Sequence, residues 1–179
     1  MVELINGLLF ILENLHSHDP PILHCDFNPK NIIHSSMSPL NLTIIDFGIA
    51  RFLGEIIPQP MAYTPGFAAP EQIFSEKLFL QSDYYSFGAF IYYTITGIIP
   101  PNSEDRHKLI KDPFVNIESL VPDIDKNLAV LINTCLKMDY NQRPKSINEI
   151  KKILQGKFKS TYIITIAPGN KHKKNKEEL

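Results

Sequence analysis

Apolar residues near the start of the chain recur at intervals of three and four positions. The residues that set this pattern are Leu4, Leu8, Ile11, Leu12 and Leu15. The spacing predicts an amphipathic helix with one buried face. The helix should end at residues 18–21, because this stretch contains two prolines, which cannot continue a helix and restrict the residue before them.

Two short apolar runs follow, at residues 31–34 and 42–45, and a serine-rich stretch with one proline separates them. This pattern predicts a small β-hairpin or a pair of short strands. Residues 54–70 contain four prolines and two glycines, so they predict a long loop without regular structure. Loops of this length in a compact domain are usually functional or disordered.

Residues 83–96 are apolar nearly all round, with aromatic, isoleucine and alanine side chains on every face. This composition predicts a buried central helix. Ser82 is the predicted N-cap of this helix, and Gly97 is its predicted end.

Two further helices are predicted downstream. The first has an apolar face between residues 128 and 136. The second opens with a capping box from Ser146 to Glu149 and closes at Gly156. The pattern as a whole predicts a mainly α fold with one small hairpin.

Composition narrows the class of protein. The 179 residues include 18 Lys and Arg, 19 Asp and Glu and 44% hydrophobic residues, which excludes a disordered, collagenous or disulfide-scaffold chain. The formal charge of -1 predicts no nucleic-acid partner. No apolar run approaches the ~18 residues of a membrane helix, so no membrane partner is predicted. Two cysteines outside any metal-like cluster favour a reducing, cytoplasmic location.

The last part of the chain differs in composition from the rest. Residues 157–179 contain six lysines and predict a solvated, partly disordered tail. Within it, residues 161–166 have the pattern of a strand, without an obvious partner in a helical domain.

Candidate chemistry begins at the segment 24–31. Asp26 is followed five residues later by Asn31 on a predicted loop. The carboxylate could orient a hydroxyl and accept its proton, and the amide oxygen could bind a hard cation; a turn in which both side chains bond only backbone is the alternative. Asp46 follows the second apolar run and precedes Phe47 and Gly48. This suits a Mg²⁺ ligand beside a mobile loop, although a simple turn would have the same residues.

Three more motifs follow in order: residues 64–71 (Thr-Pro-Gly-Phe-Ala-Ala-Pro-Glu), 83–88 (Asp-Tyr-Tyr-Ser-Phe-Gly) and 141–144 (Asn-Gln-Arg-Pro). Each has an ordinary structural interpretation: a proline-rich loop, an acidic helix start that complements the helix dipole, and a surface turn. Their conjunction in this order with the two segments above is much harder to explain structurally.

Together these motifs resemble the protein-kinase family, of the Ser/Thr type and most like its bacterial members, from about residue 1 to about residue 155. The resemblance implies a C-terminal kinase lobe over residues 1–156, with the small hairpin carrying the catalytic and metal loops. Residues 24–31 match the catalytic loop, and residues 46–71 match the activation segment.

The resemblance also implies site roles. Asp26 matches the base that takes the proton of the substrate hydroxyl, and Thr64 matches a residue that contacts this base in kinases of protein Ser/Thr hydroxyls. Asn31 and Asp46 match the two Mg²⁺ ligands that clamp the ATP phosphates, and Ile33 falls among the nucleotide-binding positions.

Other matched positions are structural. His24 is expected in the core under the catalytic loop, Asp83 is expected to hold the loop backbone, and Glu71 and Arg143 are expected to form a buried ion pair. Phe47 and Gly48 belong to the metal motif as structural residues.

Two positions depart from the family pattern. Asn28 stands where kinases place a lysine that neutralises the transferring phosphoryl group, and losing such a donor costs about 10²–10³ in rate. Cys25 stands where regulated kinases carry arginine, and Tyr63 is the only hydroxyl side chain in residues 54–63. We therefore expect no switching by activation-loop phosphorylation.

The largest departure is the N-terminal lobe, which is expected to be absent. The sequence has no Gly-rich loop, no ATP-contacting lysine and no glutamate partner for it. We therefore expect weak activity or none from the chain alone, with a separate N-lobe or partner protein as one way to complete the site. The alternatives are a non-catalytic pseudokinase or scaffold module, and a small-molecule phosphotransferase of the aminoglycoside-kinase type.

Overall fold

The computed structural model describes residues 1–37, 40–56, 61–75, 77–154 and 163–166. The described chain is mainly helical, as the sequence pattern predicts. Its elements are α1 (Val2–His16), β1 (Ile22–Leu23), η1 (Pro29–Asn31), β2 (Ile32–Met37), β3 (Leu40–Ile44), β4 (Arg51–Phe52), α2 (Pro70–Phe74), α3 (Leu80–Thr96), α4 (Ser103–Lys108), α5 (Ile117–Leu120), α6 (Lys126–Cys135), η2 (Tyr140–Gln142), α7 (Ile147–Ile153) and β5 (Ile163–Ile166).

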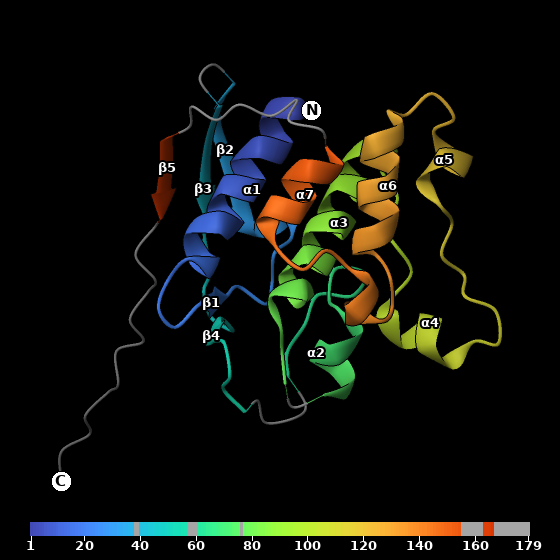
Figure 1. Cartoon of the computed structure of the whole chain (residues 1–179), viewed down its shortest axis with the longest axis horizontal. Coiled ribbons are helices and arrows are strands. Elements are labelled where there is room, and N and C mark those ends of the chain that lie inside the picture. Colours follow the sequence, from blue (N-terminus) through green and yellow to red (C-terminus); the bar gives the residue numbers. More distant parts are fainter. Residues whose placement is uncertain (38–39, 57–60, 76, 155–162, 167–179) are drawn as a thin grey trace, which may run out of the picture.

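The helices pack around α3, with α1 on one side and α6 on the other, and α7 contacts both α1 and α6 (Figure 1). The apolar face of α1 is buried as predicted, and Leu8 and Leu12 are inaccessible to solvent. Gly88 lets α3 and α6 approach closely, because a Cβ at this position would lie 2.5 Å from the Cβ of Cys135. A single hydrophobic cluster joins α1, α3, α6 and α7.

The predicted hairpin is confirmed: β2 and β3 pair antiparallel, with Ile32 opposite Ile44, and lie beside α1 (Figure 1). A second, two-stranded sheet joins β1 to β4, with Ile22 opposite Phe52. Since β1 pairs with β4 and β2 pairs with β3, two loops connect the same pairs of neighbouring strands. These are the loop between β1 and β2 and the loop between β3 and β4. The backbone N–H of Ile45 donates to the carbonyl of Asn31 at 2.8 Å, which ties the two loops together.

Several boundaries differ from the sequence prediction. Ser82 is not the N-cap of α3: the helix begins at Leu80, and the Ser82 hydroxyl accepts the N–H of the cap residue Phe79 at 3.2 Å. Pro70 was predicted to lie in the long loop, but it is the first residue of α2, because proline fits the first position of a helix. Gly97 ends α3 in the left-handed conformation, as predicted.

The last helix begins where predicted, at the N-cap Ser146, whose hydroxyl accepts the N–H of Glu149 at 3.2 Å. The box is half formed, since the Glu149 carboxylate accepts the N–H of Lys145 instead of that of Ser146. Helix α7 ends at Ile153, and the predicted stop at Gly156 lies outside the described residues.

The predicted tail strand has a partner after all. Residues Ile163–Ile166 form β5, which pairs parallel with β3 and places Ile163 opposite Asn41. The rest of the predicted tail, at 157–162 and 167–179, lies outside the described residues.

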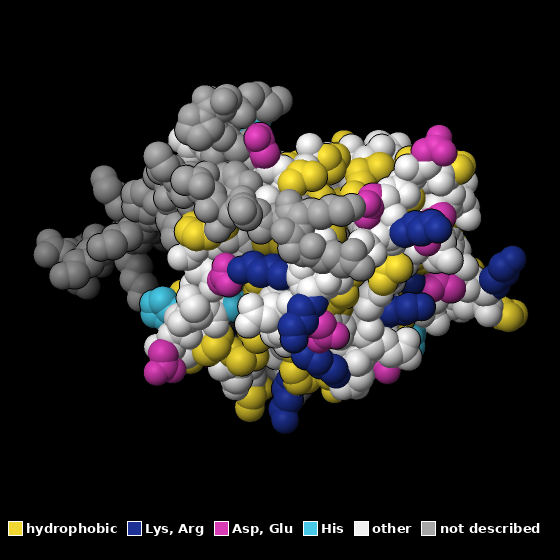
Figure 2. Space-filling view, turned by 45° about the horizontal axis from the view of Figure 1, so that its top comes forward, with side chains coloured by type: hydrophobic (Ala, Val, Ile, Leu, Met, Phe, Trp, Pro, Cys, Tyr) yellow, Lys and Arg dark blue, Asp and Glu magenta, His cyan; other side chains and the backbone are white. Residues whose placement is uncertain are grey.

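Basic and acidic side chains are interspersed on the face in Figure 2, with apolar patches between them. Such a mixture of signs agrees with the nearly balanced charge of the sequence. Among the described residues, no helix combines the length and the apolar character that crossing a membrane requires.

Candidate active site

Asp26 lies at the centre of the candidate site, on the loop between β1 and β2. Three side chains donate hydrogen bonds to its carboxylate. Thr64 Oγ1 and Asn28 Nδ2 reach Oδ1 at 2.6 and 2.7 Å, and Asn31 Nδ2 reaches Oδ2 at 2.7 Å. Both carboxylate oxygens are thereby fixed in direction, while Asp26 stays half-buried and open to a substrate.

The backbone of the loop that carries Asp26 is anchored by Asp83 at the start of α3. Its Oδ2 accepts the N–H of His24 at 2.9 Å, and its Oδ1 accepts the N–H of Cys25 at 3.0 Å. Asp83 is fully buried, and burial works against its charge, but the His16 hydrogen bond and nearby histidines hold the pKa of its carboxyl below the usual value. Cys25 has φ 66°, a conformation that this anchor stabilises.

His24 is buried beneath the loop. Its ring lies edge-on to Phe27 and Phe47, and its Nδ1 accepts the backbone N–H of Asp26 at 3.3 Å. Burial lowers the pKa of His24, so the ring is neutral and Nδ1 is the acceptor nitrogen. Burial likewise raises the pKa of the Cys25 thiol, which is therefore protonated and unreactive.

Asp46 is the exposed member of the site. It has φ 61°, and its Oδ1 accepts the N–H of Gly48 at 2.9 Å. Phe47 packs inward against the core and so turns Asp46 outward at the end of β3. Asn31 spends its amide nitrogen on Asp26, which leaves its amide oxygen for a cation. Ile33 lies on β2 with its side chain about half exposed, at 49%.

Glu71 and Arg143 meet in the interior, as a bidentate pair with distances of 2.7 and 3.0 Å. The remaining Arg143 donors bond the backbone carbonyls of Gln81, Lys137 and Met138, so the guanidinium is fully satisfied. Glu71 also accepts the Ser82 hydroxyl at 2.7 Å. The structure thereby ties α2, α3 and η2 together.

Sequence reasoning missed two residues that hold this site. His16, at the end of α1, places Nε2 2.9 Å from Asp83 Oδ2. Gln72 is buried, accepts the N–H of Ala69 and donates to the carbonyl of Cys25 at 2.6 Å. The sequence shows His16 and Gln72 only as polar residues next to apolar ones. This pattern does not identify Asp83 or Cys25 as their partners.

Comparison with known proteins bears on this geometry. The family model described as protein kinase domain matches residues 1–158. The chain belongs to the protein kinase family. It is 30% identical over 147 residues to serine/threonine-protein kinase D3 of Homo sapiens, covering 78% of this chain and 16% of that protein.

Other kinases show similar likeness. A putative serine/threonine-protein kinase/receptor of Acanthamoeba polyphaga mimivirus is 29% identical over 154 residues, covering 86% of this chain and 9% of that protein. Serine/threonine-protein kinase 17A of Oryctolagus cuniculus is 32% identical over 123 residues, covering 67% and 28%. This chain of the protein kinase family thus spans less than a third of the length of these relatives.

Proposed function

We propose that this chain is the C-terminal lobe of a Ser/Thr protein kinase, over residues 1–156, and takes part in phosphoryl transfer from ATP to a protein hydroxyl. The observation that carries the proposal is the convergence of Thr64, Asn28 and Asn31 on the Asp26 carboxylate. Asn28 and Asn31 also bond backbone groups of Asp26 and Lys30, as the side chains of a structural turn do. A turn does not require the three additional bonds to the carboxylate, which fix the direction of a half-exposed side chain.

Asp26 is the proposed base. With Oδ1 held by two donors and Oδ2 by one, the carboxylate presents its remaining lone pairs in fixed directions. A substrate hydroxyl that donates to Asp26 would be oriented for in-line attack on the γ-phosphorus of ATP. Its proton would pass to the carboxylate as its oxygen bonds to phosphorus and the bond from phosphorus to the departing ADP oxygen breaks. Thr64 belongs to the activation segment, so its hydrogen bond couples the base to the segment that would receive the peptide substrate.

Asn31 and Asp46 are the proposed Mg²⁺ ligands. One amide oxygen and one exposed carboxylate, on loops joined by the Ile45–Asn31 hydrogen bond, suit an ion that keeps several waters and phosphate oxygens. Bound Mg²⁺·ATP supplies the transferable phosphoryl group with its charge partly neutralised. Asn31 has a second task, because its amide nitrogen positions Asp26.

The exposed side chain of Ile33 suggests that part of the ATP site is supplied from outside this lobe. Its side chain faces outward from β2, 49% exposed, close in sequence to Asn31. We propose that a second lobe or a partner protein covers this apolar side chain when nucleotide binds, since buried apolar area would stabilise the adenine-bearing complex.

Asn28 favours slow phosphoryl transfer, and it supports a second candidate function for the chain. Its amide satisfies Asp26 at 2.7 Å and lies 3.3 Å from Thr64 Oγ1, so it supports the geometry of the base. It brings no positive charge to the phosphoryl group, and the side chain of Lys30 is exposed. A nucleotide-binding scaffold without efficient transfer is therefore the alternative.

The test combines nucleotide binding with transfer. Millimolar Mg²⁺·ATP should raise the melting temperature of the chain, and radiolabelled phosphate should reach a generic Ser/Thr substrate protein. Asp26→Asn should abolish transfer and keep the melting shift, whereas Asn28→Lys should raise transfer by about 10²-fold. Ser75→Ala, which removes a half-buried hydroxyl outside the Asp26 cluster, is the control.

The outcomes separate the candidates. A melting shift without transfer, unchanged by Asn28→Lys, would favour the scaffold. Transfer to an aminoglycoside and not to protein would support the small-molecule alternative. The absence of both a melting shift and transfer, even with an added kinase N-lobe, would contradict the proposed function.

A further inference from the structure

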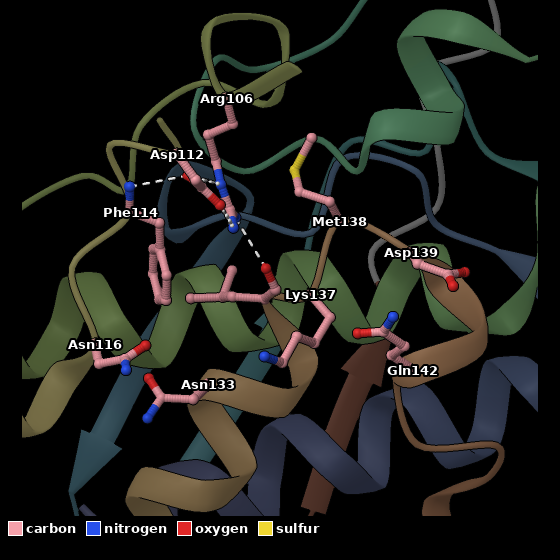
Figure 3. A pocket seen from close by; sticks show the side chains of 10 residues that line it. Arg106, Asp112, Phe114, Asn116, Asn133, Lys137, Met138, Asp139 and Gln142 are labelled. Carbon is pink, nitrogen blue, oxygen red and sulfur yellow. Dashed lines mark hydrogen bonds and ion pairs between the residues drawn. The ribbon is translucent and has the colours of Figure 1, made fainter. Parts of the chain in front are cut away.

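A hollow of about 400 Å³ lies away from Asp26, between the segment that follows α4, the end of α6 and η2 (Figure 3). Its walls combine the Phe114 ring and Leu136 with the polar side chains of Asn116, Lys137 and Gln142. The volume lies within the range of ligand-binding pockets, and the lining is mainly polar, with Phe114, Leu136 and Met138 as its apolar members.

The upper wall of the hollow is rigid and already neutralised. Arg106 is buried and donates to both oxygens of Asp112 at 2.9 and 2.7 Å. It also donates to the carbonyl of Leu136 at 2.8 Å, and its guanidinium lies 4.6 Å from the centre of the Phe114 ring. This cluster therefore shapes the hollow but offers no free charge to a ligand.

Lys137 is the available cation. It follows α6, its side chain is exposed, and its ammonium pairs with no carboxylate in the described part of the chain. In Figure 3 the side chain extends between Asn133 and Gln142, and no dashed line reaches it. Asp139, on the rim, turns its Oδ1 to the N–H of Asn141 instead. The charges of the hollow without an ion-pair partner in the described residues are therefore one cation, Lys137, and one carboxylate on the rim, Asp139.

The concave surface continues past Phe114. A neighbouring hollow of about 590 Å³ shares Asp112, Phe114 and Asn116 with the first and adds Lys111. Lys111 is also exposed, without a described carboxylate partner. Together the two hollows carry two exposed cations against one carboxylate without a described ion-pair partner, that of Asp139, with Phe114 in the lining of both. This excess of positive charge beside an apolar ring favours an extended ligand with acidic and apolar groups.

A chain of contacts links this surface to the candidate active site. Arg106 Nη1 donates to the Tyr85 hydroxyl at 3.1 Å, and the Ser103 hydroxyl lies 3.1 Å from the same oxygen. Ser103 Oγ donates to the carbonyl of Ala68 at 2.5 Å, and the N–H of Ala68 donates to the carbonyl of Thr64 at 3.1 Å. Thr64 in turn bonds Asp26.

We propose that the two hollows form a docking site for an acidic peptide segment of a partner protein, with Lys137 and Lys111 contacting its carboxylates and Phe114 contacting its apolar side chains. Occupancy acts on the activation segment through Arg106 and Ser103. Binding at this site does not depend on phosphoryl transfer, so the site would exist in a scaffold as well as in an enzyme.

The test uses a short peptide of alternating leucine and glutamate, blocked at both ends, titrated into ¹⁵N-labelled full chain. The expected result is a saturable shift of the amide signals of Asn116, Lys137 and Gln142, and a smaller shift at Thr64 and Ala68. Lys137→Glu should weaken binding about tenfold, because attraction becomes repulsion. Lys126→Glu makes the same charge change at the other end of α6 and should leave the affinity unchanged.

Three results would overturn the proposal: no saturable shift at millimolar peptide, equal binding of a leucine–glutamine peptide, or equal binding by the Lys137→Glu and Lys126→Glu variants. Shifts around the pocket without any at Thr64 and Ala68 would overturn the coupling. Both substituted lysines are exposed, so the variants should fold, and the dispersion of the amide spectrum checks this directly.

Discussion

Asp83, which anchors the loop between β1 and β2, and Asp26, which lies on that loop, each accept three hydrogen bonds but have opposite surroundings. Asp83 accepts two backbone N–H groups and the His16 ring and is fully buried. Asp26 accepts three side-chain donors and is half exposed. Backbone donors cannot move without moving the loop, whereas side-chain donors can exchange with a substrate.

Stability and chemistry depend on different charged groups in this molecule. Charges in the interior, Asp83 and the Glu71–Arg143 pair, have all their partners within the protein. The charges at the open face, Asp26 and Asp46, keep solvent access. Substitutions in the first group should therefore affect unfolding, and substitutions in the second should affect ligands.

The largest expected effect is that of Arg143→Ala. The substitution leaves Glu71 buried without its bidentate partner and three carbonyls without a donor. We expect a loss of about 3–5 kcal/mol in the free energy of unfolding, or failure to fold. Urea denaturation measures this loss, with the exposed Lys126→Ala as the control, and an unchanged midpoint would show that the pair contributes nothing.

The next effect compares the two carboxylates directly. Asp83→Asn turns an amide NH₂ toward at least one N–H donor in a buried place, which should cost about 2–3 kcal/mol. Asp26→Asn makes the same change where water can replace the lost bonds and should cost about 1 kcal/mol or less. Equal losses of Asp83→Asn and Asp26→Asn in thermal or urea unfolding would show that burial does not set the cost of removing the charge.

A pH effect should distinguish the buried His24 from the exposed histidines. Its pKa is lowered in the folded state, so between the folded and unfolded pKa values the unfolded chain binds the extra proton. Stability should therefore fall as pH drops below about 6.5, by at most about 1.4 kcal/mol per pH unit from this group. Unfolding curves at pH 7.5 and 5 measure the slope, which His24→Gln should reduce.

The smallest expected effect on stability is that of Asp46→Asn. Asp46 is exposed, and its hydrogen bond to Gly48 is available to an amide oxygen as well. The free energy of unfolding should change by less than about 0.5 kcal/mol. The Mg²⁺-dependent part of any ATP-induced melting shift should disappear, and its persistence would remove Asp46 from the proposed metal site.

Helical periodicity and prolines located the main helices and the hairpin, because burial of one face has a local signature. The helix boundaries were less predictable. Ser82 looks like an N-cap, but it lies within the first turn of α3, where its hydroxyl accepts the N–H of Phe79 and donates to the Glu71 carboxylate. The strand at Ile163–Ile166 was recognisable, while its partner β3 depends on an edge that only the folded sheet exposes.

The order of the motifs around Asp26, Asp46 and Glu71 could be read directly from the amino-acid sequence, and with it the protein kinase family. The contacts of His16 with Asp83, of Gln72 with Cys25 and of Arg106 with Tyr85 became visible only in the folded chain. The physical reason is that periodicity is a property of neighbouring residues. Hydrogen-bond partners of buried polar groups are set by packing between distant segments, which no local pattern records.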